Sequence, residues 1–174
     1  RHDLAFWPGG AADAQFERAG GAPALTQPTD GGVWLDLGGL PPYSVSALRR
    51  AQGSAPAVTT GLHVSPTLLE NDLLRVELDA AGDIMRIYDK RAAREVMPPQ
   101  TKANQFQAFE DRPMNWDAWD VDIFYEEKQY LAEPATSVRV VEAGPLRATL
   151  EIERRILNSR YTQRISLAHN AAYL

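Results

Sequence analysis

The sequence predicts an all-β fold, an antiparallel β-sandwich preceded by a small leading β segment. From residue 70 onward, short runs alternate apolar and polar positions, and Gly, Pro, Asn or Asp separates one run from the next. No long window carries apolar residues at the helical period of about 3.6 residues. Alternation of this kind indicates half-buried antiparallel strands with one face in a core and the other in water.

Individual strands can be predicted within the sandwich region. Residues 74–79 alternate apolar and charged side chains, and a turn over 80–83 is expected to reverse the chain into a second strand over 84–88. A short apolar element follows at 96–97. The clearest alternation lies in 146–153, where four residues are expected to face the core: Leu146, Ala148, Leu150 and Ile152.

Two further segments are predicted to pair with that strand. Residues 138–141 precede the Gly144-Pro145 turn, and residues 161–167 follow a second turn with Ile165 and Leu167 facing inward. The three segments together predict an antiparallel sheet.

The first 60 residues differ from the rest because Gly and Pro are dense. Short strands are expected at 4–7 and 33–37, and residues 44–50 are compatible with a helical turn. The small and polar residues of 51–56 are typical of a linker. The sequence therefore predicts a leading β segment over 1–55 and a sandwich region over 56–174.

Composition excludes several classes of protein. The 18 Lys and Arg residues against 23 Asp and Glu give a net charge of −5, which disfavours nucleic acid as a partner. No apolar stretch approaches the ~20 residues that a membrane-spanning helix needs. Cysteine is absent, which excludes disulfides and thiolate metal sites and leaves the cytoplasm as the expected location.

One segment, residues 109–122, combines acidic and aromatic side chains. Such a mixture suits sugars, because an aromatic ring covers the apolar face of a pyranose while carboxylates accept hydrogen bonds from its hydroxyls. The candidate substrate-binding residues are Trp116, Asp117, Trp119 and Asp120. The alternative is a structural loop, in which the tryptophans plug the edge of the sandwich and the acids cap turns or remain solvated.

Other catalytic chemistries find little support in the residues. Asp117 and Asp120 would suit a small glycosidase only if their carboxyl groups lay about 5 Å apart across the scissile bond. His2, His63 and His169 are scattered, with no spacing that places two metal ligands on one element. Neither a nucleophile elbow nor a Gly-rich phosphate loop is present. We therefore assign no catalytic and no metal-binding residue.

Three stretches, taken in order, resemble the central and C-terminal β region of the family 38 α-mannosidases among the glycoside hydrolases. They are residues 69–76, 82–96 and 109–120, and the third, with its Trp-Asp-Ala-Trp-Asp element, is the most specific. Residues 35–45, which contain Pro41-Pro42-Tyr43, are similar to the segment that leads into this region. The resemblance covers roughly residues 33–167.

This resemblance implies a supersandwich-like fold and a parent enzyme that is a retaining, exo-acting α-mannosidase with zinc in its active site. In that family the zinc ligands and the nucleophile come chiefly from an N-terminal domain, whose motifs are absent here. The expected function is a non-catalytic portion that packs on the catalytic domain of the same polypeptide and brings its loop to the mannoside. A free-standing carbohydrate-binding module is the alternative.

The C-terminal end carries one further expectation. Residues 165–174 read as a strand and its exit, and we expect the sandwich to be incomplete at this point. An unpaired edge strand can add a strand from another chain. Association of the chain with itself is therefore predicted.

Overall fold

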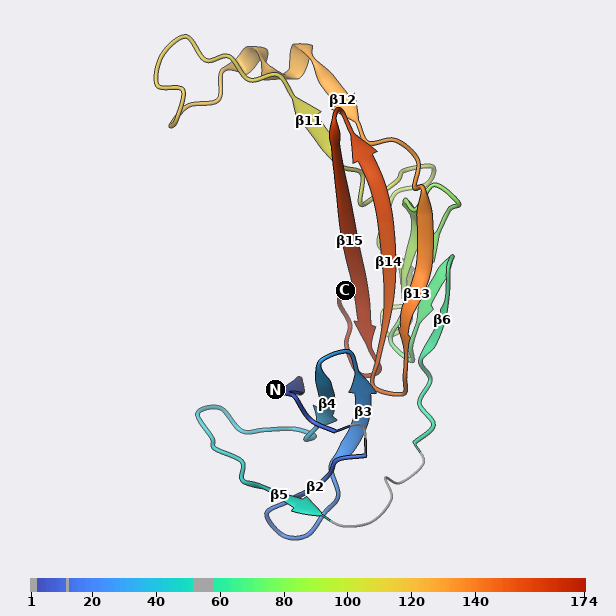
Figure 1. Cartoon of the computed structure of the whole chain (residues 1–174). Helices are drawn as coiled ribbons and strands as arrows, with labels where there is room; N and C mark the ends of the chain where they lie inside the picture. The colour runs from blue at the N-terminus through green and yellow to red at the C-terminus, as the bar shows by residue number, and fades with distance from the viewer. Residues whose placement is uncertain (1–2, 12, 52–57) are drawn as a thin grey trace.

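The computed structural model describes residues 3–11, 13–51 and 58–174. Within these ranges the chain is built of antiparallel strands, with helical structure only in the short 3-10 helix η1 (Ile123–Glu127). No helix in these ranges is long and apolar enough to span a membrane. Figure 1 shows a small unit near the N-terminus, a two-sheet body, and a long arm that projects from the far end of the body.

The leading β unit, residues 3–51, has five strands: β1 (Leu4–Pro8), β2 (Gln15–Arg18), β3 (Leu25–Thr29), β4 (Gly32–Asp36) and β5 (Leu48–Ala51). They form a sheet of order β1-β4-β3 and a separate β2-β5 pair. The β3–β4 hairpin turns through Asp30 and Gly31, and Gly31 adopts the positive φ of 76° that such a tight turn requires. Phe16, Val33 and Leu35 are buried in a small core of this unit.

The first sheet of the body has five strands in the order β10-β9-β8-β7-β6. Its strands are β6 (His63–Ser65), β7 (Leu68–Glu70), β8 (Leu74–Leu78), β9 (Ile84–Asp89) and β10 (Arg94–Glu95). The turn between β8 and β9 places Gly82 at φ 81°, and the Gly82 amide donates to the Asp79 carbonyl at 3.0 Å.

The second sheet has three long strands in the order β13-β14-β15. They are β13 (Ser137–Ala143), β14 (Arg147–Ile156) and β15 (Ser159–Ala168), and β14 pairs with β15 over its whole length. A register shift between Val140 and Glu142 interrupts the pairing of β13 with β14. β15 lies at one edge of this sheet.

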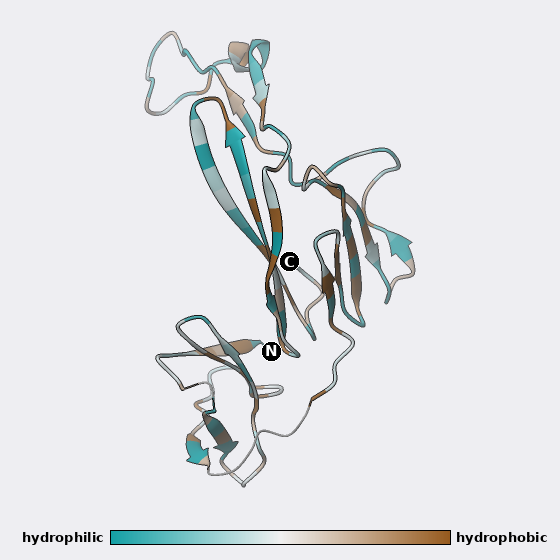
Figure 2. Cartoon of the chain, turned by 45° about the vertical axis from the view of Figure 1, so that its right-hand side comes forward, coloured by the Kyte–Doolittle hydropathy of each residue, from teal (hydrophilic) through white to brown (hydrophobic). Residues whose placement is uncertain are grey.

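The two sheets of the body share one hydrophobic core. Alternation along each strand points one set of side chains inward, and six members of the shared core are completely buried: Leu69, Val76, Ala148, Leu150, Ile152 and Leu167. Figure 2 shows apolar residues gathered on strands of both sheets. Burial of each large aliphatic side chain contributes about 1.5–3 kcal/mol, so this core is the main source of stability.

Two polar groups join the sheets inside the body. The Asn71 amide donates to the carbonyls of Ala168 (2.7 Å) and Ala171 (2.8 Å). Arg154, on the inner face of β14, donates to the Asp83 carboxylate at 2.7 Å, and the exposed fractions of the two side chains are 3% and 8%. Both contacts link residues distant in sequence, so they fix how one sheet lies on the other.

The arm comprises residues 107–131. β11 (Gln107–Phe109) and β12 (Gln129–Leu131) pair antiparallel at its base, and residues 110–122 with η1 form its tip. At the root of the arm the Phe106 and Tyr161 rings lie 4.5 Å apart, which attaches it to β15.

The prediction of an all-β antiparallel sandwich is confirmed, as are the strands expected at 74–79, 84–88 and 146–153. A helical turn at 44–50 does not form, because Leu48–Ala51 is a strand that pairs with β2. At 96–97 no strand forms, and Met97 instead packs against the core. The predicted linker at 51–56 falls largely outside the described residues, so the boundary between 1–55 and 56–174 remains a prediction.

Candidate functional site

The four predicted site residues lie together at the tip of the arm. The carbonyl of Trp116 accepts hydrogen bonds from the amides of Trp119 (2.7 Å) and Asp120 (3.0 Å), so residues 116–120 form one compact turn. Trp116 adopts a positive φ of 61°, a conformation that side-chain-bearing residues rarely take. The local backbone therefore presents both tryptophans and both acids on one turn.

The indole rings at this tip are largely in solvent. The exposed fraction is 74% for Trp116 and 91% for Trp119, and Asp117 and Asp120 are also exposed. In the part of the chain that the structure describes, neither carboxylate makes a side-chain hydrogen bond or ion pair. The structural alternative predicts rings that plug the edge of the sandwich, and among the described residues the two indoles are instead exposed. It also allows solvated acids, so the exposure of Asp117 and Asp120 agrees with either interpretation.

Ion pairs and one aromatic contact connect the two sides of the arm below its tip. The Glu110 carboxylate forms ion pairs with Lys128 and Arg112, and hydrogen bonding from Lys128 is the main reason that the pKa of Glu110 is lowered. The Phe109 and Tyr125 rings meet edge to face at 5.2 Å. These contacts hold the two sides of the arm together beneath residues 116–120.

Sequence reasoning missed the apolar residues that surround the tip. Four large apolar side chains are mostly exposed there: Met114 (83%), Val121 (61%), Ile123 (80%) and Phe124 (57%). The sequence signal was available, since Met114 and Val121 lie within the acidic-aromatic segment and Ile123 and Phe124 directly follow it. Several large apolar side chains exposed on one projection are typical of a contact with another protein surface or a ligand.

A second candidate is the pocket between the leading β unit and the outer face of β13–β15, with a volume of about 470 Å³. Its central group is the Glu142 carboxylate. One oxygen accepts hydrogen bonds from Thr29 and from the Trp34 indole (3.2 Å), and the other accepts from Arg147 (2.6 Å) and Thr149. All of this acceptor capacity is used within the chain.

The electrostatics of Glu142 agree with a structural role. Burial by itself would raise the pKa of its carboxyl, but the hydrogen bonds, that from Arg147 foremost, lower the pKa to about 2. The Arg147 guanidinium also lies 4.1 Å from the Trp34 ring, whose neighbour Phe6 lies at 4.9 Å. These contacts therefore join the leading β unit to the second sheet, and we do not take the pocket as the functional site.

The described residues also do not fit a zinc site. Across residues 3–11, 13–51 and 58–174, no group of three or more His, Asp or Glu side chains lies where it could hold a metal ion. No chemical step of this chain is assigned to a metal.

Part of this chain is similar in sequence to much longer known proteins. The chain is 32% identical over 108 residues to alpha-mannosidase 2C1 of Homo sapiens, and this region is 61% of the chain and 10% of the human protein. It is 31% identical over 86 residues to alpha-mannosidase G of Dictyostelium discoideum, covering 49% of the chain and 8% of that protein. The chain thus spans about a tenth of the length of these relatives.

The fold has a counterpart among solved structures. A crystal structure of an alpha-mannosidase from Enterococcus faecalis matches 98% of this chain and 27% of its own with a TM-score of 0.63, at 11% sequence identity. The likeness includes the leading β unit as well as the body.

The family is shown by a further match. The model described as "Glycosyl hydrolases family 38 C-terminal domain" matches residues 69–174, which include the second sheet, the whole arm and the first sheet except for β6 and the first residue of β7. This chain therefore belongs to glycosyl hydrolase family 38 and carries its C-terminal domain.

Proposed function

We propose that this chain is the non-catalytic β-sandwich portion of a retaining α-mannosidase and works as part of a longer polypeptide. Family membership and the names of its relatives support the proposal, and so does the small share of those relatives that the chain spans. In this proposal a catalytic domain in the same polypeptide supplies the nucleophile and the zinc. The chain packs on that domain.

The single observation that carries the finer proposal is the exposed arm. Its tip displays Trp116 and Trp119 to solvent beside the free carboxylates of Asp117 and Asp120. Rings and acids arranged in this way bind a sugar by stacking and by accepting hydroxyl hydrogen bonds. We place the tip at the rim of the substrate cleft, where it would bind the mannoside.

The first experiment compares the purified 174-residue chain with the longer polypeptide, using an aryl α-mannoside with and without added zinc. The proposal expects turnover by the longer polypeptide alone. Zinc-independent turnover by the chain itself would overturn it, because the chain would then hold the catalytic residues.

The second experiment tests the tip in the longer polypeptide with Trp119→Ala and Asp120→Asn. Loss of a stacking ring or of a hydrogen bond to substrate is expected to lower kcat/KM by roughly tenfold, since such contacts contribute about 1 kcal/mol or more. Glu127→Gln changes another exposed acid of the arm and is the matched control. Kinetics equal to the control for both variants, with unchanged stability, would remove the tip from the cleft.

Exposure of the two indoles also supports a second candidate, a free-standing carbohydrate-binding module. This candidate predicts that the isolated chain binds methyl α-mannoside and that indole fluorescence changes on titration. A signal lost in Trp116→Ala and in Trp119→Ala would favour the module. A flat titration curve with an active longer polypeptide would favour the mannosidase portion.

A further inference from the structure

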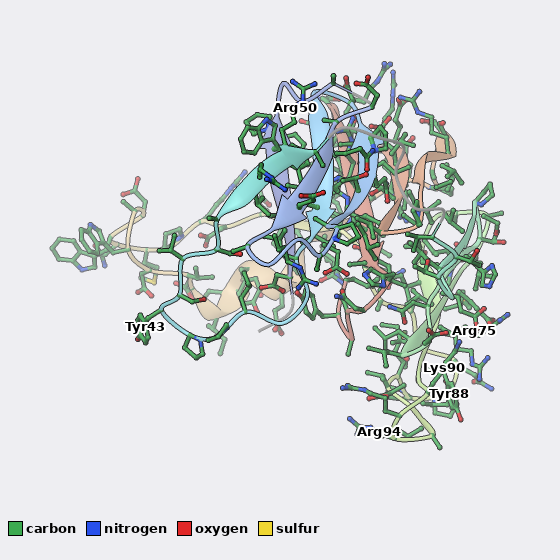
Figure 3. All side chains as sticks on the ribbon, turned by 90° about the horizontal axis from the view of Figure 1, so that it is seen from below. Tyr43, Arg50, Arg75, Tyr88, Lys90 and Arg94 are labelled. Carbon is green, nitrogen blue, oxygen red and sulfur yellow. The ribbon has the colours of Figure 1, made fainter. Side chains whose placement is uncertain are left out.

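A second projection, far from the arm in sequence, shares the arm's unusual surface. In the loop between β4 and β5, Tyr43 is fully exposed and 99% of Val45 is exposed. Figure 1 shows this loop and the arm projecting to the same side of the molecule, from opposite ends. The view from below in Figure 3 agrees, since Tyr43 lies on the side to which the arm extends.

The two projections also share a strained apex. Tyr43 adopts a φ of 55° and Trp116 a φ of 61°, both in the left-handed region that aromatic residues avoid. Pro41 and Pro42 restrict the loop, and the Ser44 hydroxyl donates to the Pro41 carbonyl at 2.7 Å. Strain of this kind clusters where a side chain is held for a ligand or a partner, although it also occurs at other turns of this chain, such as Leu157 with a φ of 51°.

The opposite side of the molecule has a different character. On the outer face of the first sheet, Arg75 pairs with Glu70 and Glu77, and Arg86 pairs with Glu77 and Glu95. Figure 3 shows Arg75, Tyr88, Lys90 and Arg94 on the side away from Tyr43. Cross-strand pairs of opposite charge satisfy one another and suit a face that stays in water.

The large apolar side chains that are at least 74% exposed in the described chain therefore all lie in the two projections: Tyr43, Val45, Met114, Trp116, Trp119 and Ile123. We infer that the 38–47 loop and the arm form a two-point clamp on a single partner, the catalytic domain of the same longer polypeptide. The relatives are about ten times longer than the matched region, so their polypeptide contains enough additional chain to occupy both points. The likeness to the Enterococcus faecalis structure covers the leading unit and the body together, so the fold of both recurs within a chain that is nearly four times as long.

This inference rests on the proposed function and adds the 38–47 loop to it. The direct test is hydroxyl-radical labelling of the longer polypeptide, with the oxidation of Tyr43 compared with that of Tyr88 in the same molecule. With a free loop, Tyr43 is oxidised faster because its side chain is fully exposed, whereas Tyr88 is partly buried and has Arg86 5.1 Å from its ring. With the clamp closed, the order is reversed.

Variants provide the second measurement. Tyr43→Ser is expected to lower the midpoint of thermal unfolding of the longer polypeptide by several degrees. Arg94→Ser, which changes an exposed side chain on the opposite side, is the control and is expected to leave it unchanged. The same Tyr43→Ser substitution should not shift the unfolding of the 174-residue chain, where the ring is fully exposed.

The outcomes separate the two proposals. An active longer polypeptide in which Tyr43 is oxidised faster than Tyr88 would overturn the clamp and leave the proposed function intact. Protection of Tyr43 in a polypeptide without mannosidase activity would support the docking and overturn the function. Protection that disappears on dilution, together with a halving of the mass, would mean that a second copy covers the loop, which also overturns the clamp.

Discussion

The body and the arm are neighbours in one chain, yet they place their apolar residues in opposite environments. Leu69, Leu150 and Ile152 in the body are completely buried, whereas Met114 and Trp119 in the arm are 83% and 91% exposed. The body therefore supplies its own stability. The arm is held at its base by a short strand pair and aromatic contacts, and the apolar surface at its tip requires a partner to be buried.

The largest loss of stability in the body is expected when its buried ion pair is broken. Asp83→Ala would leave the Arg154 guanidinium buried without its charge partner, and we expect a loss of about 3–5 kcal/mol in the free energy of unfolding. Urea denaturation measures this loss. Replacing both residues with leucine should recover most of it, and a double variant as unstable as Asp83→Ala would contradict this explanation.

A cavity in the shared core is the next largest change. Leu150→Ala is expected to cost about 2–5 kcal/mol, because the completely buried side chain leaves a space that its neighbours fill only in part. Leu157→Ala, in the β14–β15 turn with 59% of the side chain exposed, is the control and should cost less than about 0.5 kcal/mol. Equal losses in the two variants would refute the assignment of the core.

A substitution at the junction between the leading β unit and the body should cause an intermediate loss in the free energy of unfolding. Glu142→Gln keeps the shape but weakens the hydrogen bonds from Arg147, Thr149 and Thr29, and we expect a loss of about 2 kcal/mol near neutral pH.

The same residue predicts a dependence on pH. The pKa of Glu142 is lowered in the folded state to about 2, from an ordinary value of 4.5, so its charged form stabilises the fold above pH 4.5. This contribution is lost as the pH falls from 4.5 towards 2. The difference in stability between the native chain and Glu142→Gln should shrink over this range, and a difference independent of pH would exclude the mechanism.

The smallest change in the free energy of unfolding is expected for a substitution at the tip of the arm. Trp119→Ala in the 174-residue chain should change the free energy of unfolding by no more than about 0.5 kcal/mol, because 91% of the side chain is exposed. Chemical denaturation followed by circular dichroism measures the change. A large loss would mean that the ring packs on the body in solution, and the comparison between body and arm would fail.

Alternation along the chain predicted the body well because it reports local information. Residues two apart on a strand share a face, so the inward positions of Leu74, Val76 and Leu150 follow from the sequence alone. The same rule failed at 44–50, where no helix forms. The end of that segment, from Leu48, belongs to a strand because it pairs with Gln15–Arg18, and a pairing partner some 30 residues away leaves no local signal.

The candidate site was predicted in part. Its four residues were identified from composition and resemblance, and the structure brings them onto one exposed turn, while their role in substrate binding stays a proposal. The exposed apolar surface around them was not predicted. Apolar residues in a sequence are expected to be buried, and only the path of the chain shows that these have no core to enter.

By itself, the sequence determined the all-β class, the inward faces of the main strands and the family resemblance, because each depends on residues close together in the chain. The tertiary structure decided which charges are buried. Arg154 follows the inward alternation of β14 yet is charged, and its place in the interior depends on Asp83 from another sheet. The tertiary structure also brought Tyr43 and the arm to one side, because that placement depends on how distant strands pack and not on local sequence.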